Sequence, residues 1–147
     1  MHIYEAELNE EVIRALISLS EEWEKENSCY GYRANTAEEI ERNRIFLAEE
    51  NGEVKGYLFG KVCESKSMRS IMPEGTPFFE VEEIYVTPAC RSKGVGAALF
   101  RCAEDAVRCS AHYMVLSTAT KNWKAVFHFY LDELDMNFWS ARLFKEI

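Results

Sequence analysis

The chain has 147 residues, of which 48% are hydrophobic, and 25 acidic against 17 basic side chains give a net charge of −8. This length supports one hydrophobic core but not two ordinary domains, so we expect a single domain over residues 1–147. The acidic balance argues against non-specific nucleic-acid binding. The first residues lack a basic and apolar leader, and no apolar run is long enough to span a bilayer, so we expect no membrane association and a cytosolic location.

The cysteine content points to reduced thiols. Cys29, Cys63, Cys90, Cys102 and Cys109 form no C-x-x-C pair, and no histidine stands at ligand spacing from them. An odd number of cysteines without a leader favours free thiols over a disulfide framework, and we expect no metal site.

The first third of the chain predicts a strand followed by two helices. Residues 2–6 have the composition of a short strand, and Asn9 can cap a helix whose apolar residues follow helical spacing. Residues 29–35 interrupt that pattern. Residues 36–39, Thr-Ala-Glu-Glu, then form a capping box that begins a brief second helix.

A hairpin is expected next. Residues 44–50 and 53–63 read as strands joined by Asn51-Gly52, a pair that favours a two-residue turn. Residues 64–77 show no periodicity and are expected to form a loop.

The second half alternates strands and helices. A strand is predicted over residues 78–87, a helix from the following turn to about Cys109, an apolar buried strand over 113–117, a helix over 123–134 and a last strand over 138–144. The element order β-α-α-β-β-β-α-β-α-β gives an α/β fold with a mixed sheet and helices on both faces. The last strand is a candidate edge for pairing with a second copy, as a homodimer.

The turn Arg91-Ser92-Lys93-Gly94-Val95-Gly96 stands between a strand and a helix. Two glycines let the backbone approach a ligand, and a helix N-terminus favours a phosphate or pyrophosphate. The third glycine and distant acid of a dinucleotide-binding fingerprint are absent, as is the P-loop pattern, which disfavours a nucleotide-binding switch protein.

The segment from Val86-Thr87-Pro88 to Leu99 resembles the acyl-CoA-binding motif of the GCN5-related N-acetyltransferases (GNAT), Arg/Gln-x-x-Gly-x-Gly/Ala after a Val-x-Pro-like turn. The resemblance is sharp from Glu82 to Leu99 and extends to the rest of the chain in element order. It implies a splayed parallel strand pair, acetyl-CoA as cosubstrate, and direct attack of a primary amine on the thioester in a ternary complex. The residues that it assigns to CoA binding are Ile84, Tyr85, Val86, Arg91, Ser92, Lys93, Gly94, Val95, Gly96, Ala97 and Asn122.

Glu82 and Glu83 are the candidates for the base that deprotonates the amine. Strand alternation would put Glu82 with Ile84 and Val86, and Glu83 on the other face with Val81 and Tyr85. Both faces are apolar, so at least one carboxylate should be desolvated with a raised pKa. The family pattern favours Glu82.

Tyr130 is the candidate acid that protonates the CoA thiolate. The resemblance implies such a tyrosine in an Asn-x-x-Ala-x-x-Phe-Tyr pattern, but Tyr130 arrives one residue late after Asn122 and Ala125. One extra residue rotates a side chain by about 100°. Tyr130 therefore fits only if a bulge such as a π-turn absorbs the insertion. His128 is expected to lie on the helix surface, and Asn122 to cap the helix or to bind the pantetheine arm.

Acceptor recognition is expected from residues 29–35 and from the loop over 64–77, with Tyr30, Tyr32 and Met68 offering apolar and cation–π surface. The acceptor is a small-molecule or peptide amine whose identity the sequence does not determine. The alternative to an N-acetyltransferase is a CoA-binding regulatory or interaction module that lacks useful catalysis, an alternative kept open by the late position of Tyr130.

Overall fold

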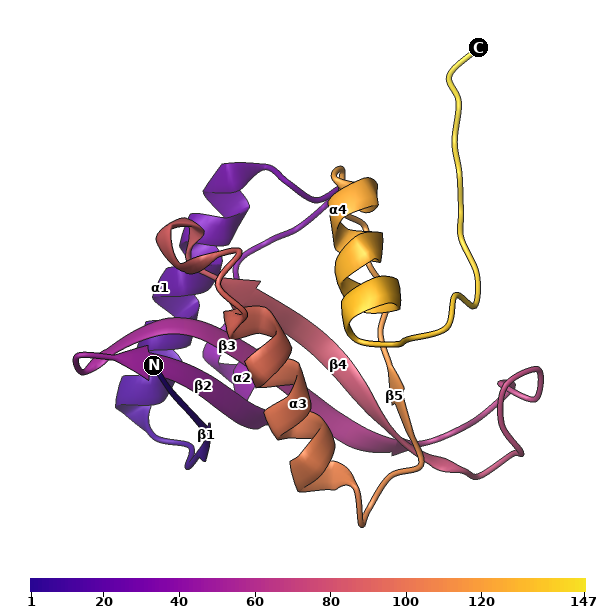
Figure 1. Cartoon of the computed structure of the whole chain (residues 1–147), viewed down its shortest axis with the longest axis horizontal. Helices are drawn as coiled ribbons and strands as arrows, with labels where there is room; N and C mark the ends of the chain where they lie inside the picture. Colours follow the sequence, from indigo (N-terminus) through magenta and orange to yellow (C-terminus); the bar gives the residue numbers. More distant parts are fainter.

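A computed structural model describes all 147 residues. The elements are β1 (His2–Ala6), α1 (Glu10–Glu26), α2 (Ala37–Glu41), β2 (Arg44–Glu50), β3 (Glu53–Glu64), β4 (Pro77–Val86), a 3₁₀ turn (Pro88–Cys90), α3 (Val95–Val107), β5 (Tyr113–Val115), α4 (Trp123–Phe127) and a π-helix (His128–Glu133) that continues α4. Figure 1 shows them along the chain. The predicted order of elements is confirmed up to the end of this last helix.

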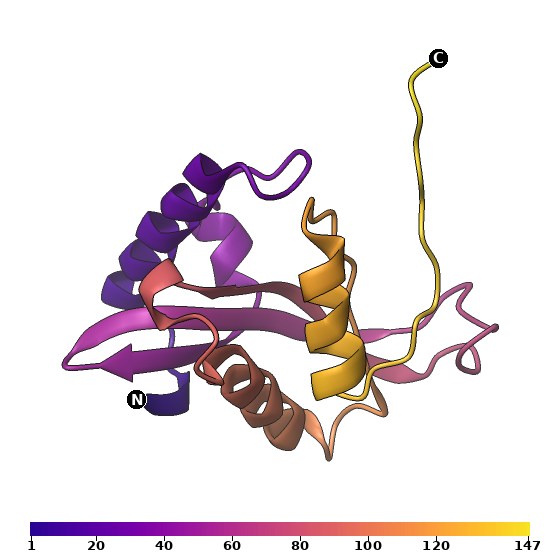
Figure 2. The ribbon, with the colours of Figure 1, turned by 45° about the horizontal axis from the view of Figure 1, so that its top comes forward.

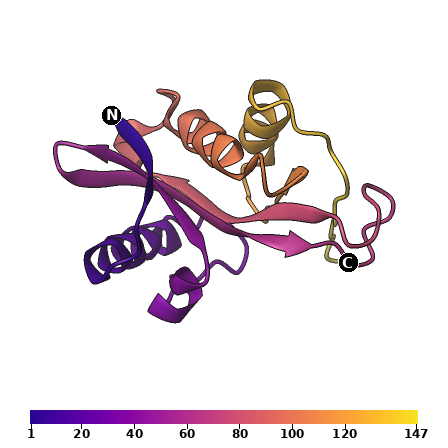
Figure 3. The same ribbon diagram turned by 90° about the horizontal axis from the view of Figure 1, so that it is seen from below.

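The five strands form one sheet in the order β1-β2-β3-β4-β5. The first three pairs are antiparallel, and β4 and β5 are parallel. Figure 3 shows α1 and α2 on one face of the sheet and α3 and α4 on the other. The mixed α/β sheet expected from the sequence is therefore confirmed.

Each face of the sheet carries its own core. Phe46, Leu58, Phe79 and Val81 pack with the buried side of α3, including Leu99. The second core, under α1 and α2, consists of Leu16, Leu19, Ile40, Ile45, Leu47, Tyr57, Phe59 and Tyr85. The sheet is thus buried on both sides, as its apolar strands require.

Two helices begin, and the hairpin turns, at the residues that the sequence predicts. The Asn9 side chain accepts a hydrogen bond from Val12 N at 2.9 Å, and Thr36 Oγ1 accepts one from Glu39 N at 3.4 Å. Asn51 and Gly52 both have positive φ, 53° and 77°, as a two-residue hairpin turn requires.

A β-bulge interrupts the pairing of β3 with β4. Phe59 pairs with Glu83 and Gly60 with Val81, so Glu82 is an extra residue without an opposite partner. A Cβ on Gly60 would lie 2.1 Å from the carbonyl oxygen of Glu80. Only glycine fits at this point of β3, and the bulge changes which residues of β4 share a face.

The predicted last strand is wrong for this chain. Residues 138–144 pair with no strand; the segment from Asp135 to Ile147 is extended and runs clear of the sheet (Figure 1). β5 is consequently an edge strand, and its exposed Tyr113 departs from the buried strand that we expected there. No helix has the length and apolarity that crossing a membrane would require.

Candidate active site

The parallel strands β4 and β5 separate beyond their first three pairs. Phe78, Phe79 and Glu80 pair with Tyr113–Val115, after which β4 continues to Val86 paired only with β3. The chain after β5 turns instead to the loop that follows α1: Tyr30 N donates to Ala119 O at 2.9 Å and Lys121 N to Ser28 O at 2.8 Å. Figure 2 shows this loop reaching the segment before α4. The edge of β4 that β5 leaves therefore has no strand partner from Val81 to Val86.

The turn predicted to bind phosphate lies at the end of β4. Ser92 and Gly94 have positive φ, 60° and 81°, and Gly94 is the N-terminal cap of α3 without a capping side chain. The first amides of a helix have no partner within it, and here no side chain accepts from them. Ser92, Lys93 and Gly94 are exposed. These amides and the Lys93 ammonium fit the charge and acceptor atoms of a diphosphate.

Arg91 has a different environment from the one expected. Its Nη2 lies 2.7 Å from Glu26 Oε1 at the end of α1, and its Nε donates to Val86 O at 2.8 Å. The guanidinium also lies 5.3 Å from the ring centroid of Tyr85. Because Thr87 N is bonded to Lys55 O on β3, the Val86 carbonyl of the same peptide points away from β3, where Arg91 reaches it. Arg91 thus fixes the end of β4 to α1, and its charge is already paired.

Gly96 allows the last helix to approach α3. A Cβ on Gly96 would lie 3.1 Å from the Phe129 ring. Phe129 belongs to the π-helix His128–Glu133, in which Leu134 N donates to Phe129 O at 3.1 Å. The π-turn that the late position of Tyr130 demanded is therefore present, since each i→i+5 turn accommodates one additional residue.

Tyr130 follows Phe129 with the two ring centroids 5.1 Å apart. Its hydroxyl makes no hydrogen bond within the chain, and burial raises the pKa of Tyr130 to about 12, with a smaller contribution from nearby Cys29. The phenol therefore stays protonated at neutral pH and is free to donate. Cys29 belongs to the α1–α2 loop, so Tyr130 lies near that loop.

The bulge places both candidate bases on one face of the sheet. Glu82 and Glu83 line the same cavity beside α2, whereas Ile84 and Val86 pack against the α3 core. The expectation that Glu82 shares a face with Ile84 and Val86 is wrong, because an extra residue at a bulge breaks strand alternation. Glu82 is exposed, and Glu83 is half-buried.

Glu83 is held by three donors. Its Oε2 accepts from Tyr57 Oη at 2.8 Å and from Tyr32 Oη at 3.1 Å, and Asn35 Nδ2 lies 2.9 Å from both carboxylate oxygens. Burial raises the pKa of Glu83, although these hydrogen bonds favour its charged form. Burial and the Glu83 charge raise the pKa of Tyr57 and Tyr32, which therefore remain donors. Oε1 accepts only from Asn35 and keeps a free lone pair.

Asn35 and Tyr57 are site residues that the sequence reasoning missed. Asn35 is buried and fixed by its own backbone, since Asn35 N donates to the buried Ser20 Oγ at 3.0 Å. Nothing local in the sequence distinguishes either residue. A glycine inside a strand, such as Gly60, can mark a bulge, and this was the one signal that Glu82 and Glu83 share a face.

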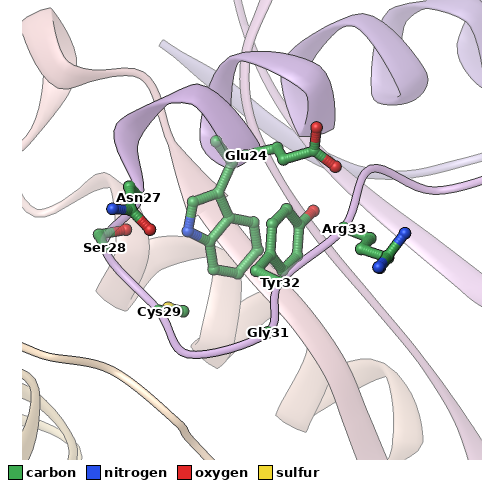
Figure 4. A pocket seen from close by; sticks show the side chains of 8 residues that line it. Glu24, Asn27, Ser28, Cys29, Gly31, Tyr32 and Arg33 are labelled. Atoms are coloured by element: carbon green, nitrogen blue, oxygen red, sulfur yellow. The ribbon is translucent and has the colours of Figure 1, made fainter.

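Two hollows lie on the α1–α2 face. A hollow of about 370 Å³ is lined by the end of α1 and the following loop, and Figure 4 shows Glu24 of α1 and Tyr32 of the loop among its side chains. Trp23, from the same end of α1, stacks on Tyr32 with ring centroids 4.1 Å apart. A second, of about 210 Å³, is lined by Asn35, Glu39, Arg42, Asn43, Phe59, Lys61, Glu82 and Glu83. Through Tyr32 and Asn35, Glu83 connects the two hollows.

Three further expectations have clear outcomes. The Asn122 side chain does not cap α4, which has no side-chain cap. His128 lies on the surface, as expected, with its Nδ1 2.8 Å from Asp132 Oδ2. The loop over residues 64–77 lies at the end of β4 opposite the phosphate turn, where His112 N donates to Pro77 O at 2.9 Å.

Comparison with known families identifies the chain. The family model described as the acetyltransferase (GNAT) family matches residues 6–134. The chain belongs to this family. The predicted resemblance is therefore confirmed over most of the sequence. No curated protein sequence matches the chain.

Solved structures share the fold over the whole chain at low sequence identity. The aminoglycoside 6′-N-acetyltransferase AAC(6′)-Ig of Acinetobacter haemolyticus has a TM-score of 0.69 at 19% identity, with 100% of this chain and 98% of that chain covered. AAC(6′)-Iy in complex with CoA has a TM-score of 0.70 at 16% identity, with 99% of this chain and 98% of that chain covered. The ribosomal-protein-alanine N-acetyltransferase of Brucella melitensis biovar Abortus 2308 has a TM-score of 0.69 at 17% identity, with 99% of this chain and 100% of that chain covered. These similarities support the fold and do not select an acceptor.

Proposed function

We propose that this GNAT protein transfers an acetyl group from acetyl-CoA to a primary amine by direct attack. The observation that carries the proposal is the arrangement around the second half of β4. A turn with free amides lies at its end, and the half-buried carboxylate of Glu83 lies on its α1–α2 face. The diphosphate would bind the amides of Gly94, Val95, Gly96 and Ala97, with Ser92 and Lys93 beside them.

The pantetheine arm would pair with the unpaired edge of β4 at the Ile84 main chain and the Val86 N–H, with Asn122 beside it. The main chain of Tyr85 takes no part, because Tyr85 lies two residues before Thr87, whose N–H is bonded to β3, and it therefore faces β3 as well. The Val86 carbonyl contributes less than expected, because it already accepts from Arg91. Arg91 keeps its place in the proposal as the residue that positions the turn. Its pairing with Glu26 makes it a weak phosphate ligand.

Glu83 is our preferred base, in place of Glu82. An alkyl ammonium has a pKa near ~10, so at neutral pH it must lose a proton to attack. Glu83 Oε1 has a free lone pair, and burial raises the pKa of the Glu83 carboxyl group. Both properties suit Glu83 to accept that proton directly or through one water. As the nitrogen–carbon bond forms and the carbon–sulfur bond breaks, Tyr130 gives its proton to the departing thiolate.

The acceptor would enter from the α1–α2 face. One hollow is lined by three carboxylates, Glu39, Glu82 and Glu83, against the two cations Arg42 and Lys61, and Trp23 and Tyr32 line the other hollow. This combination suits an ammonium group carried on an apolar or ring-shaped body. All five cysteines are free, which is consistent with the cytosolic location that we expect.

The test is thiol release from acetyl-CoA with a panel of primary amines. The panel comprises a polyamine, an aminoglycoside, free amino acids, and peptides with a free N-terminus or a lysine. We expect amine-dependent thiol release and an acetylated amine by mass spectrometry. CoA binding by calorimetry without any amine-dependent release would instead support the regulatory module.

A further inference from the structure

The hollow beside α2 is lined almost entirely by polar and charged side chains. Phe59 is the only apolar residue among the eight that line it. The charged side chains are of both signs, with Glu39, Glu82 and Glu83 against Arg42 and Lys61. Its volume of about 210 Å³ lies below the roughly 300–1,000 Å³ of sites that hold drug-sized ligands. The hollow therefore suits a small and highly polar group.

The lysine of this hollow has no carboxylate partner. The ion pairs that arginine and lysine make in this chain all use other residues. Lys61 is half-buried on β3, and its Cα partner on β4, Glu80, stays outside ion-pair distance. Because Lys61 stands two residues after Phe59, the Cα partner of Glu83, it lies on the same face of the sheet as the proposed base.

The arginine of the hollow is fixed at the end of α2. Arg42 Nε donates to Glu38 O, one turn earlier, at 3.3 Å, and both Nη groups are without a partner. A guanidinium held in this way presents its outer N–H groups to an anion. Arg42 and Lys61 are thus two unpaired positive charges in one hollow.

The carboxylates of the hollow do not neutralise these cations. Glu39 Oε1 accepts from Thr36 Oγ1 at 3.2 Å in the capping box, and Glu83 accepts from its three donors. Glu82 is exposed to water. The hollow therefore combines a carboxylate oxygen that can take a proton from an ammonium group with two cations that can bind an anion.

We propose, on the basis of the function proposed above, that the acceptor is a small amine that also carries a carboxylate, as a free amino acid does. Its amino group would lie at Glu83, and its carboxylate would bind Arg42 and Lys61. An apolar side chain on the acceptor would extend toward Trp23 and Tyr32 in the other hollow.

Acceptors with several ammonium groups fit this arrangement less well. A polyamine or an aminoglycoside with one amine at Glu83 would bring further positive charges toward Arg42 and Lys61, and like charges at close range repel. The N-terminus of a peptide has no carboxylate on the carbon that bears its amino group. The two cations therefore select a free amino acid over these other amines.

Matched acceptors test the role of the carboxylate. Thiol release and mass spectrometry are applied to the standard amino acids, to the amide and the decarboxylated amine of the best of them, and to spermidine, kanamycin and a peptide. We expect kcat/KM for the amino acid to exceed that for its amide by roughly tenfold or more, because hydrogen bonds between charged groups are the stronger ones. The amide is the stricter comparison, since its ammonium group is more acidic and more of it is free amine at neutral pH.

Substitutions test the two cations. Lys61→Met and Arg42→Gln should each lower the ratio of kcat/KM for the amino acid to kcat/KM for its amide by roughly tenfold. Lys66→Met, at an exposed lysine of the β3–β4 loop, is the matched control for the first. Arg14→Gln is the control for the second, because the exposed Arg14 also donates from Nε to a carbonyl four residues earlier, Glu10 O. Both controls should keep the ratio, and a loss of folded protein lowers both rates without changing it.

The outcomes separate the substrate class from the function itself. An amide used as well as its amino acid, or a ratio that survives both Lys61→Met and Arg42→Gln, refutes a carboxylate-bearing acceptor. Transfer to spermidine, kanamycin or the peptide but to no amino acid also refutes it, and leaves the acetyltransferase function standing. The absence of amine-dependent thiol release with every acceptor refutes the proposed function, and the substrate class with it.

Discussion

Replacing Glu83 with glutamine should disable the proposed base while keeping most of its surroundings. In the folded protein Oε2 of Glu83 accepts from Tyr57, Tyr32 and Asn35, whereas Oε1 accepts from Asn35 alone. The amide oxygen of glutamine should take the place with three donors. The NH₂ group then lies where Oε1 was, and cannot accept a proton from the amine.

The expected loss in kcat/KM at neutral pH is roughly 10²- to 10⁴-fold, the usual contribution of a general base. This corresponds to about 2.7–5.5 kcal/mol at about 1.36 kcal/mol for each factor of ten. The loss should shrink as the pH approaches ~10, because free amine becomes abundant. For the unaltered protein, kcat/KM should fall as the pH drops through the pKa of Glu83, which burial raises above its usual value.

Thiol release against amine concentration, with unfolding followed on the same samples, measures the effect. Glu82→Gln is the matched control, because Glu82 lines the same hollow one residue away but is exposed. It should change kcat/KM by less than about threefold. A folded Glu83→Gln protein with unchanged kcat/KM would refute the reasoning, and a disabled Glu82→Gln protein would transfer the role to Glu82.

Three other predictions concern the turn, the acid and the bulge. Gly94→Asp should weaken CoA binding, measured by calorimetry, by roughly tenfold or more relative to Gly94→Asn. The two side chains have similar size and tolerate positive φ similarly, but only aspartate repels phosphate. Equal affinities of the two variants would contradict a phosphate site at this turn. Tyr130→Phe should lower kcat and kcat/KM together by roughly 10- to 10³-fold with acetyl-CoA affinity nearly unchanged, since the hydrogen bond from the Tyr130 hydroxyl to the thiolate strengthens only in the transition state. A fully active variant would remove Tyr130 from the mechanism. Gly60→Ala should lower the free energy of unfolding by about 1–3 kcal/mol or more, because its Cβ would meet the Glu80 carbonyl at 2.1 Å; unchanged stability in denaturant titration would mean that the strands shift freely.

The bulge explains why the pair of glutamates could not be resolved from the sequence. In a strand without a bulge, successive side chains point to opposite faces of the sheet, and this rule would put Glu82 and Glu83 of β4 on different faces. In the fold, a bulge opposite Phe59 and Gly60 makes Glu82 an extra residue, and both carboxylates then line the hollow beside α2. The burial that distinguishes them comes from Asn35 and Tyr57, residues remote in sequence.

The sequence by itself determined the order of the elements up to the last helix, the glycine turn and the need for a π-turn at Tyr130. Each depends on neighbours within one or two turns of chain, where spacing and backbone preference decide. Tertiary structure decided the rest. The pairing of Arg91 with Glu26, the three donors around Glu83 and the unpaired tail after Asp135 depend on contacts between distant segments, or on the lack of one. Such contacts leave no local pattern, because a hydrogen bond or a strand edge is satisfied by whatever partner the packed chain brings within reach.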